Sequence, residues 1–178
     1  MTPGSVPAPP AARLADPATG PRVALRLVTT HEDRTRRLDV VVQGQTSALL
    51  EGGEQTLFST ERLWPVLREE LPPLDALRAA PRGRLLHDAA EPGPTFVADC
   101  RAHVSLATLV ATGPEPVAAT EVALRSWLAT ETGLWSVTPT AEGGTRVLSA
   151  PEGALADHLV WDVSAAMEAL VRGLEATS

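Results

Sequence analysis

The sequence predicts an α+β fold made of two quasi-symmetric ββββα units, in which amphipathic helices pack on an antiparallel sheet. Alternating apolar and polar residues, the pattern of half-buried strands, open each half of the chain. Each half then carries a Gly–Gly pair before its fourth predicted strand, and a serine and an amphipathic helical pattern after it. The same order of signals in both halves favours an internal duplication over a chance recurrence of hairpins and helices.

The first unit begins with two alternating runs separated by a charged turn. Its apolar positions are Val23, Leu25 and Leu27 in the first run, and Leu38, Val40 and Val42 in the second, with the turn at His31–Arg37. Two shorter strands follow at Thr46–Glu51 and Gln55–Phe58. Gly52–Gly53 separates them and favours a tight hairpin, because glycine adopts the positive φ that such turns require.

A helix is expected to complete the first unit, from a capping Ser59 to about Leu71. Leu63, Leu67 and Leu71 recur at every fourth position and give the helix an apolar stripe. Pro65 fits only in a first turn, so the helix is expected to start near Trp64, and Pro72–Pro73 ends it.

The second unit repeats this order. Its predicted strands are His103–Thr112, Glu121–Leu128, Leu134–Thr138 and Thr145–Leu148, and Gly143–Gly144 precedes the last of them. Ser149 and Glu152 match a capping box, which predicts a helix from Ser149 to about Ala176. Its apolar stripe comprises Leu155, Leu159, Val163, Met167 or Ala166, Leu170 and Leu174.

These units define one domain with a tail. Residues 1–21 hold six prolines and few large apolar groups, so we expect a disordered Pro-rich tail. The domain is expected to span residues 22–178, with lobe one at 22–73, a connector at 74–102 and lobe two at 103–178.

Composition excludes several classes of protein. The formal net charge is −7, which disfavours nucleic acid as a partner because phosphates are bound by clustered positive charge. A single cysteine, Cys100, allows neither an intrachain disulfide nor a multi-cysteine zinc site. No apolar run is long enough for a transmembrane helix and no signal peptide is apparent, so we expect no membrane insertion and a cytoplasmic location.

Few residues suggest catalysis or metal binding. The four histidines have none of the spacings of zinc hydrolases. His87–Asp88 could orient a general base, but no nucleophile motif accompanies it. Arg101 could lower the pKa of the Cys100 thiol, although a lone cysteine near a strand is more often a small buried residue. We therefore expect no catalytic residue, no metal and no cofactor.

Four residues are candidates for binding a partner. Arg34 and Arg36 lie in the charged turn and could pair with carboxylates of another protein. Trp127 and Trp135 flank the turn at residues 129–133, where they could form a cross-strand pair that stabilises the hairpin or a patch that faces a partner.

Two stretches of the chain resemble the EspG family. One runs from Val23-Ala24-Leu25-Arg26-Leu27-Val28 to Leu71-Pro72-Pro73, and the other is the hairpin Arg125–Pro139 with its Trp, Thr-containing turn, Gly and second Trp. The resemblance implies a cytosolic chaperone of type VII (ESX) secretion with two quasi-symmetric α/β lobes. The absence of lysine, isoleucine, asparagine and tyrosine fits a high-GC genome such as that of an actinobacterium, where this family occurs.

The resemblance therefore implies a non-enzymatic chaperone or adaptor whose partner is a secreted helical-hairpin protein of the PE/PPE or WXG100-like kind. A small binding or immunity-type protein is the first alternative. An enzyme whose site is assembled from distant residues is the second, and a large polar pocket would favour it.

Overall fold

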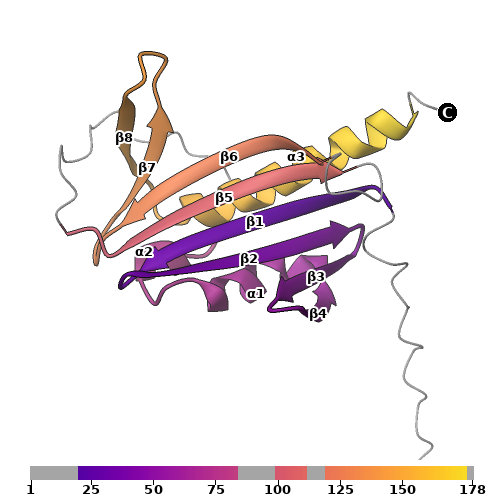
Figure 1. The fold of residues 1–178 in the computed structure, drawn as a ribbon, viewed down its shortest axis with the longest axis horizontal. Helices are drawn as coiled ribbons and strands as arrows, with labels where there is room; N and C mark the ends of the chain where they lie inside the picture. The colour runs from indigo at the N-terminus through magenta and orange to yellow at the C-terminus, as the bar shows by residue number, and fades with distance from the viewer. Residues whose placement is uncertain (1–19, 84–98, 112–118, 176–178) are drawn as a thin grey trace, which may run out of the picture.

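The computed structural model describes residues 20–83, 99–111 and 119–175, and this part of the chain forms one antiparallel sheet of eight strands (Figure 1). The spatial order is β4-β3-β2-β1-β5-β6-β7-β8. The strands are β1 (Arg22–His31), β2 (Arg34–Gln43), β3 (Thr46–Glu51), β4 (Glu54–Ser59), β5 (Ala102–Ala111), β6 (Ala119–Ala129), β7 (Leu134–Pro139) and β8 (Thr145–Ala150). The mixed α+β class is confirmed, and most of the fold is sheet.

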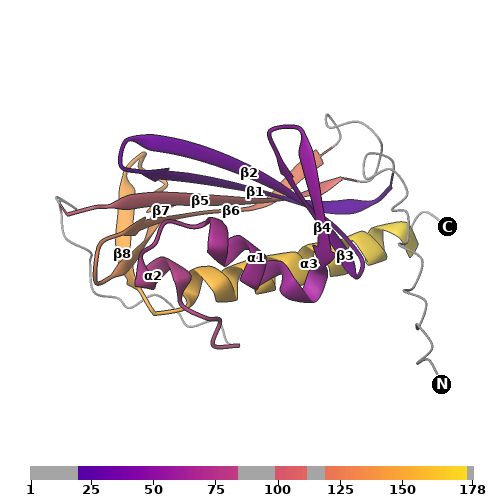
Figure 2. The same ribbon diagram turned by 90° about the horizontal axis from the view of Figure 1, so that it is seen from below.

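The helices lie together on one face of the sheet (Figure 2). They are the 3₁₀ turn η1 (Thr60–Arg62), α1 (Leu63–Glu70), α2 (Asp75–Arg78) and α3 (Ala154–Glu175). No helix among the described residues covers the other face. The described residues therefore form two layers, and their helices bury one face of the sheet.

The core fills the space between the sheet and the helices. Strands β1 and β5 form its centre and pair over ten residues, with Leu27 opposite Leu106. The buried apolar side chains of the four central strands share this face: Val23, Leu25, Leu27, Leu38, Val40, Val42, Val104, Leu106 and Trp127. The two halves of the chain thus share one core across the β1–β5 pair.

The predicted stripe of the last helix is confirmed. Leu155, Leu159, Val163, Ala166 and Leu170 are buried and Met167 is partly buried, whereas the side chain of Leu174 lies outside the described residues. Burying one leucine in such a stripe contributes about 1.5–3 kcal/mol. The stripe therefore attaches α3 to the sheet.

The predicted start of that helix is wrong. Ser149 belongs to β8, where it pairs with Trp135, and the helix begins five residues later at Ala154. Gly153, with φ of +84°, turns the chain between the two elements, and the Ala154 amide donates to the carbonyl of Pro151 at 3.1 Å. The strand pairing of Ser149 and Ala150 prevails over the local capping-box pattern.

The first helix begins close to its expected place. Ser59 ends β4 and makes no capping bond with its side chain, and α1 starts after η1. Pro65 is the third residue of α1, where a helix has no internal partner for the missing N–H. The helix ends at Glu70, one residue before the expected Leu71.

The predicted turn at His31–Arg37 is shorter than expected. Strands β1 and β2 continue to His31 and Arg34, and only Glu32 and Asp33 form the turn, with φ of 48° and 60°. Two adjacent positive φ values are typical of a type I′ hairpin turn. Arg34 and Arg36 are therefore strand residues, with alternating side-chain directions fixed by β2.

Several expectations concern residues that the structure does not describe. The tail up to residue 19, the middle of the connector (84–98) and the turn before β6 (112–118) fall in this group. Within the described part of the connector, Asp75–Arg78 form the short helix α2, and β5 begins at Ala102.

Candidate functional site

The face of the sheet away from the helices is the first candidate site. Opposite residues in paired strands share a face, and successive residues of one strand alternate between faces. Because Leu25 and Leu27 point to the helices, Arg26 between them points away. We use the term open face for the side chains of β1, β2, β5 and β6 that point away from the helices.

The register orders the open face into rows that cross the sheet. The central row is Asp39, Arg26, Ala107 and Leu124. The next row is Arg37, Val28, Ser105 and Ser126, in which the two serine hydroxyls lie 3.0 Å apart. A third row joins Val41, Ala24, Leu109 and Glu121, and a fourth joins Thr35, Thr30, His103 and Leu128.

Apolar side chains are exposed on this face. Leu124, at one end of the central row, is 61% exposed. Leu57 on β4 is also exposed, but it lies beyond the open face, because its register partner Ala48 on β3 is buried. Val28, Val41, Leu109 and Leu128 are partly exposed. A surface that mixes such groups with charges is typical of protein interfaces.

Three charged residues cluster on the open face. The Arg26 Nε lies 3.0 Å from Asp39 Oδ1, and an Arg37 Nη2 lies 2.8 Å from Asp39 Oδ2. Two guanidinium groups thus share one carboxylate, and this cluster has a surplus positive charge. Exposed pairs of this kind add little stability but can select a partner by charge.

Arg36 has a structural role that the sequence does not reveal. It lies on the helix side of the sheet, where its guanidinium contacts Glu51 of β3 and Glu70 of α1, each at 2.7 Å. The Arg36 pKa is raised, chiefly by the hydrogen bond with Glu51. Partial burial lowers the pKa, and the nearby Glu70 raises it further. Arg36 connects three elements and is already occupied by two carboxylates.

Arg34 occupies the end of the same hairpin. It is exposed, lies opposite His31, and shares the strand face of Arg36. The structure therefore separates both arginines from the open face, because they lie on the alternate positions of β2. Arg34 remains a candidate at the rim of the molecule.

The two tryptophans do not form a pair. Trp127 lies opposite Ser136 and Trp135 lies opposite Leu128, so their side chains point to opposite faces. Trp127 is only 1% exposed, and its ring centroid lies 6.1 Å from that of His158 on α3. Trp127 is therefore a core residue, and no surface of the described fold presents it to a partner.

Trp135 closes the turn between β6 and β7. Its ring lies so near Gly133 that a Cβ there would be 2.6 Å from the ring atom Cη2. The Thr130 hydroxyl accepts hydrogen bonds from the amide of Gly133 at 3.2 Å and from that of Thr132 at 3.4 Å. Trp135 is partly exposed and packs against its own turn.

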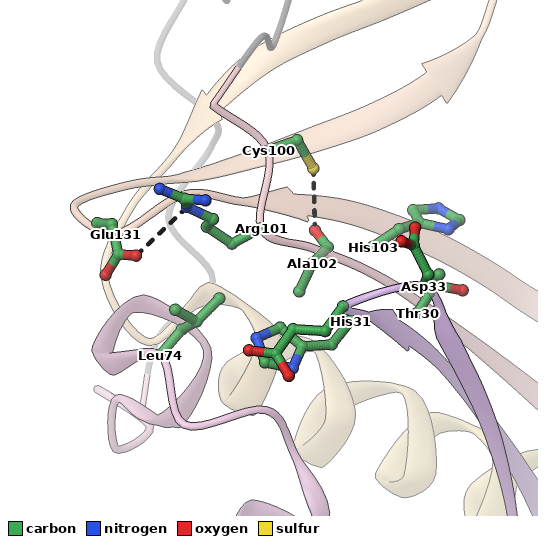
Figure 3. A pocket seen from close by; sticks show the side chains of 10 residues that line it. Thr30, His31, Asp33, Leu74, Cys100, Arg101, Ala102, His103 and Glu131 are labelled. Atoms are coloured by element: carbon green, nitrogen blue, oxygen red, sulfur yellow. Dashed lines mark hydrogen bonds and ion pairs between the residues drawn. The ribbon is translucent and has the colours of Figure 1, made fainter.

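A polar cavity of about 530 Å³ lies at the end of the sheet where the β1–β2 hairpin, the start of β5 and the β6–β7 turn meet (Figure 3). The half-buried Cys100 thiol donates to the carbonyl of Ala102 at 3.3 Å, and Arg101 lies 3.3 Å from Glu131. His31 and His103 also line it. In the described ranges, no three His, Cys, Asp or Glu residues are placed to hold a metal ion.

A second cavity, of about 630 Å³, is mainly apolar and lies between the start of α1 and the middle of α3. Trp64, Val160 and Val163 are among its lining residues. The buried Trp64 Nε1 has no hydrogen-bond partner among the residues that the structure describes. The His87–Asp88 pair lies outside the described residues, so its relation to either cavity is not defined.

Sequence reasoning did not identify Arg26, Arg37, Asp39 and Leu124 as a shared surface. The available signal is the alternation itself, because a charged residue between two buried leucines must face away from the core.

No protein-family model and no curated protein matches the chain. Within the described ranges, no helix has the length and apolar character needed to cross a membrane.

Proposed function

We propose that the protein is a non-catalytic cytoplasmic adaptor or chaperone that binds a helical-hairpin protein on the open face. The observation that carries this proposal is the sheet face that none of the described helices covers, where exposed Leu124 lies in one row with the Arg26–Asp39 pair. An apolar helical tip could bury these groups and would be protected from aggregation while bound. No cofactor and no nucleic acid is required.

The arrangement of the strands supports a duplicated unit of the kind that the EspG resemblance implies. The strands of the first half have 10, 10, 6 and 6 residues, and those of the second half have 10, 11, 6 and 6. Each half forms a meander with its first strand at the centre of the sheet. We interpret the halves as two quasi-symmetric ββββα lobes, related about the β1–β5 pair.

Charge on the open face gives the proposed interface a register. Arg26 and Arg37 share the single carboxylate of Asp39, so a carboxylate of the partner can form an ion pair with one of the two arginines. Secreted helical hairpins of the PE/PPE or WXG100-like kind are the proposed partners. Arg34 could add a contact at the rim, whereas Arg36 and Trp127 contribute to the fold.

Co-expression with helical-hairpin proteins encoded beside the gene tests this function. We expect a soluble complex that co-purifies with the wild-type protein and is weakened at least tenfold by Ala107→Glu and by Leu124→Glu. Trp161→Glu is the matched control, because Trp161 is 57% exposed on α3 in the helix layer. A complex that survives both open-face substitutions, or failure to bind any neighbouring helical hairpin, would refute the proposal.

A further inference from the structure

Strand β6 is paired along its whole length on one side and along only part of it on the other. Its register with β5 extends from Ala119 to Ala129, whereas β7 pairs only with Ser126–Ala129. Figure 1 shows β7 and β8 turning away from β6 beyond this point. On that side of residues 119–124, no described strand completes the ladder.

Hydrogen bonds at the adjoining turn show to which side the backbone N–H and C=O groups of β6 point. The Thr130 amide donates to the Gly133 carbonyl at 3.0 Å, across the β6–β7 side. The Ala129 carbonyl instead accepts from Arg101 at 2.8 Å, on the β5 side. The backbone N–H and C=O groups of successive strand residues point alternately to the two sides of the strand. Leu124 is an even number of residues from Thr130, so its N–H and C=O point to the open edge.

Two large apolar side chains at this edge are exposed. Leu124 and Val122 are 61% and 49% exposed. Exposed edges in proteins are usually protected by charge, as Glu54 of β4 and Arg146 of β8 protect the outer edges here. The irregular register at Thr108/Leu109 lies within this stretch, because Thr108 pairs with Ala123 and Leu109 with Glu121, which leaves Val122 without a register partner on β5. It bends β6 there but adds no charge to Val122 or Leu124.

We infer that the edge of β6 at residues 119–124 binds one short extended peptide segment of another protein by β-strand addition. Backbone groups pair with an extended chain, and the presence of β7 at Ser126 limits the segment to about six residues. Glu121 lies within the stretch and the net charge of the chain is −7, so the segment carries a lysine or arginine. This site shares Leu124 with the open face, but it binds through the outward backbone groups of β6, whereas the proposed helical hairpin contacts the side chains of the open face.

Two end-blocked peptides test the inference: Lys-Thr-Val-Thr-Val-Thr and Thr-Val-Thr-Val-Thr-Lys. The two positions of lysine distinguish parallel from antiparallel addition. In fluorescence anisotropy with the full chain, we expect saturable binding of at least one peptide. Methylation of alternate peptide nitrogens should abolish it, since the ladder needs those donors. Amide exchange at Leu124 in the wild-type protein should slow at least tenfold when the peptide is bound.

Leu124→Pro removes the outward N–H and should weaken the peptide at least tenfold, whereas Trp161→Glu should leave its binding unchanged. Proline is tolerated best at strand edges, and circular dichroism checks that the variant is folded. If that variant does not fold, the exchange measurement on the wild-type protein decides. Absence of binding by both peptides, equal binding of the methylated peptide, or unchanged exchange at Leu124 would overturn the inference. Ala107→Glu changes a side chain on β5 opposite Leu124 and leaves the backbone groups of β6 unchanged. Loss of the hairpin complex in that variant and loss of the peptide in Leu124→Pro are therefore separate results.

Discussion

Gly143 and Gly153 both need a positive φ, but Gly153 also lacks space for a side chain. Comparing alanine substitutions at the two positions separates the cost of backbone strain from the cost of a steric clash. Both residues have positive φ, +84° and +79°. A Cβ on Gly153 would lie 2.5 Å from the Ala80 carbonyl oxygen, whereas one on Gly143 would meet no atom within 4 Å. We expect Gly143→Ala to lower the free energy of unfolding by about 1 kcal/mol, from backbone strain alone. Gly153→Ala should lower it by about 3 kcal/mol, because the clash is with rigid backbone. Urea denaturation measures both, and equal losses would contradict this account.

Two ion pairs of α3 differ in burial and should differ in strength. Arg125 contacts the buried Asp162 through two hydrogen bonds of 2.6 and 2.8 Å, while Glu168 and Arg172 are both exposed. Asp162→Ala should lower the free energy of unfolding by about 2 kcal/mol, because it removes both bonds from a partly buried guanidinium. Glu168→Ala should cost less than about 0.5 kcal/mol. Salt titration of the two variants checks the assignment, because screening should reduce only the contribution of the exposed pair.

At the scale of elements, the apolar stripe of α3 predicts that substitutions at two adjacent residues will differ in their effect on stability. Leu170 is buried against the sheet, and Val171, next to it, is 54% exposed. Leu170→Asp places a charge in the core and should lower the free energy of unfolding by more than about 4 kcal/mol. Val171→Asp should change it by less than about 0.5 kcal/mol. Thermal melts followed by circular dichroism compare the two, and a wild-type melt for Leu170→Asp would show that the stripe is not core.

The sequence predicts the ends of an element well where the residues next to those ends determine them. The strand at Thr46–Glu51 has its predicted bounds because glycines and turn residues flank it on both sides. The capping box at Ser149 is wrong because hairpin pairing with β7 holds Ser149 and Ala150 in β8. The predicted length of the charged turn is wrong because hairpin pairing of β1 with β2 continues to His31 and Arg34. Periodicity identifies the elements, and tertiary pairing decides where they end.

At the scale of the whole molecule, the candidate site depends on which strands become neighbours. Arg26 and Asp39 are adjacent by a local hairpin, but Ala107 and Leu124 reach them only through the β1–β5 pair. The sequence contains the alternation that separates the two faces, yet it does not state the strand order. Trp127 shows the consequence, because its burial depends on the helix from the far end of the chain packing on β6. For this reason the sequence predicts the fold class more completely than the site.

The shared β1–β5 pair predicts that neither half of the chain folds alone. Ten residue pairs, from Arg22–Ala111 to His31–Ala102, join the halves, and Leu27 and Leu106 pack at their centre. Expressed alone, residues 1–83 or 99–178 would expose a central apolar strand as an edge, and we expect each to aggregate or remain unfolded. Co-expressed, the two fragments should reconstitute one soluble complex with a single cooperative thermal transition. Leu27→Asp in the first fragment should prevent this reconstitution, whereas Leu57→Asp, at an exposed position of β4, should permit it. A half that is monomeric and melts cooperatively by itself would show that the β1–β5 pair does not unite the core.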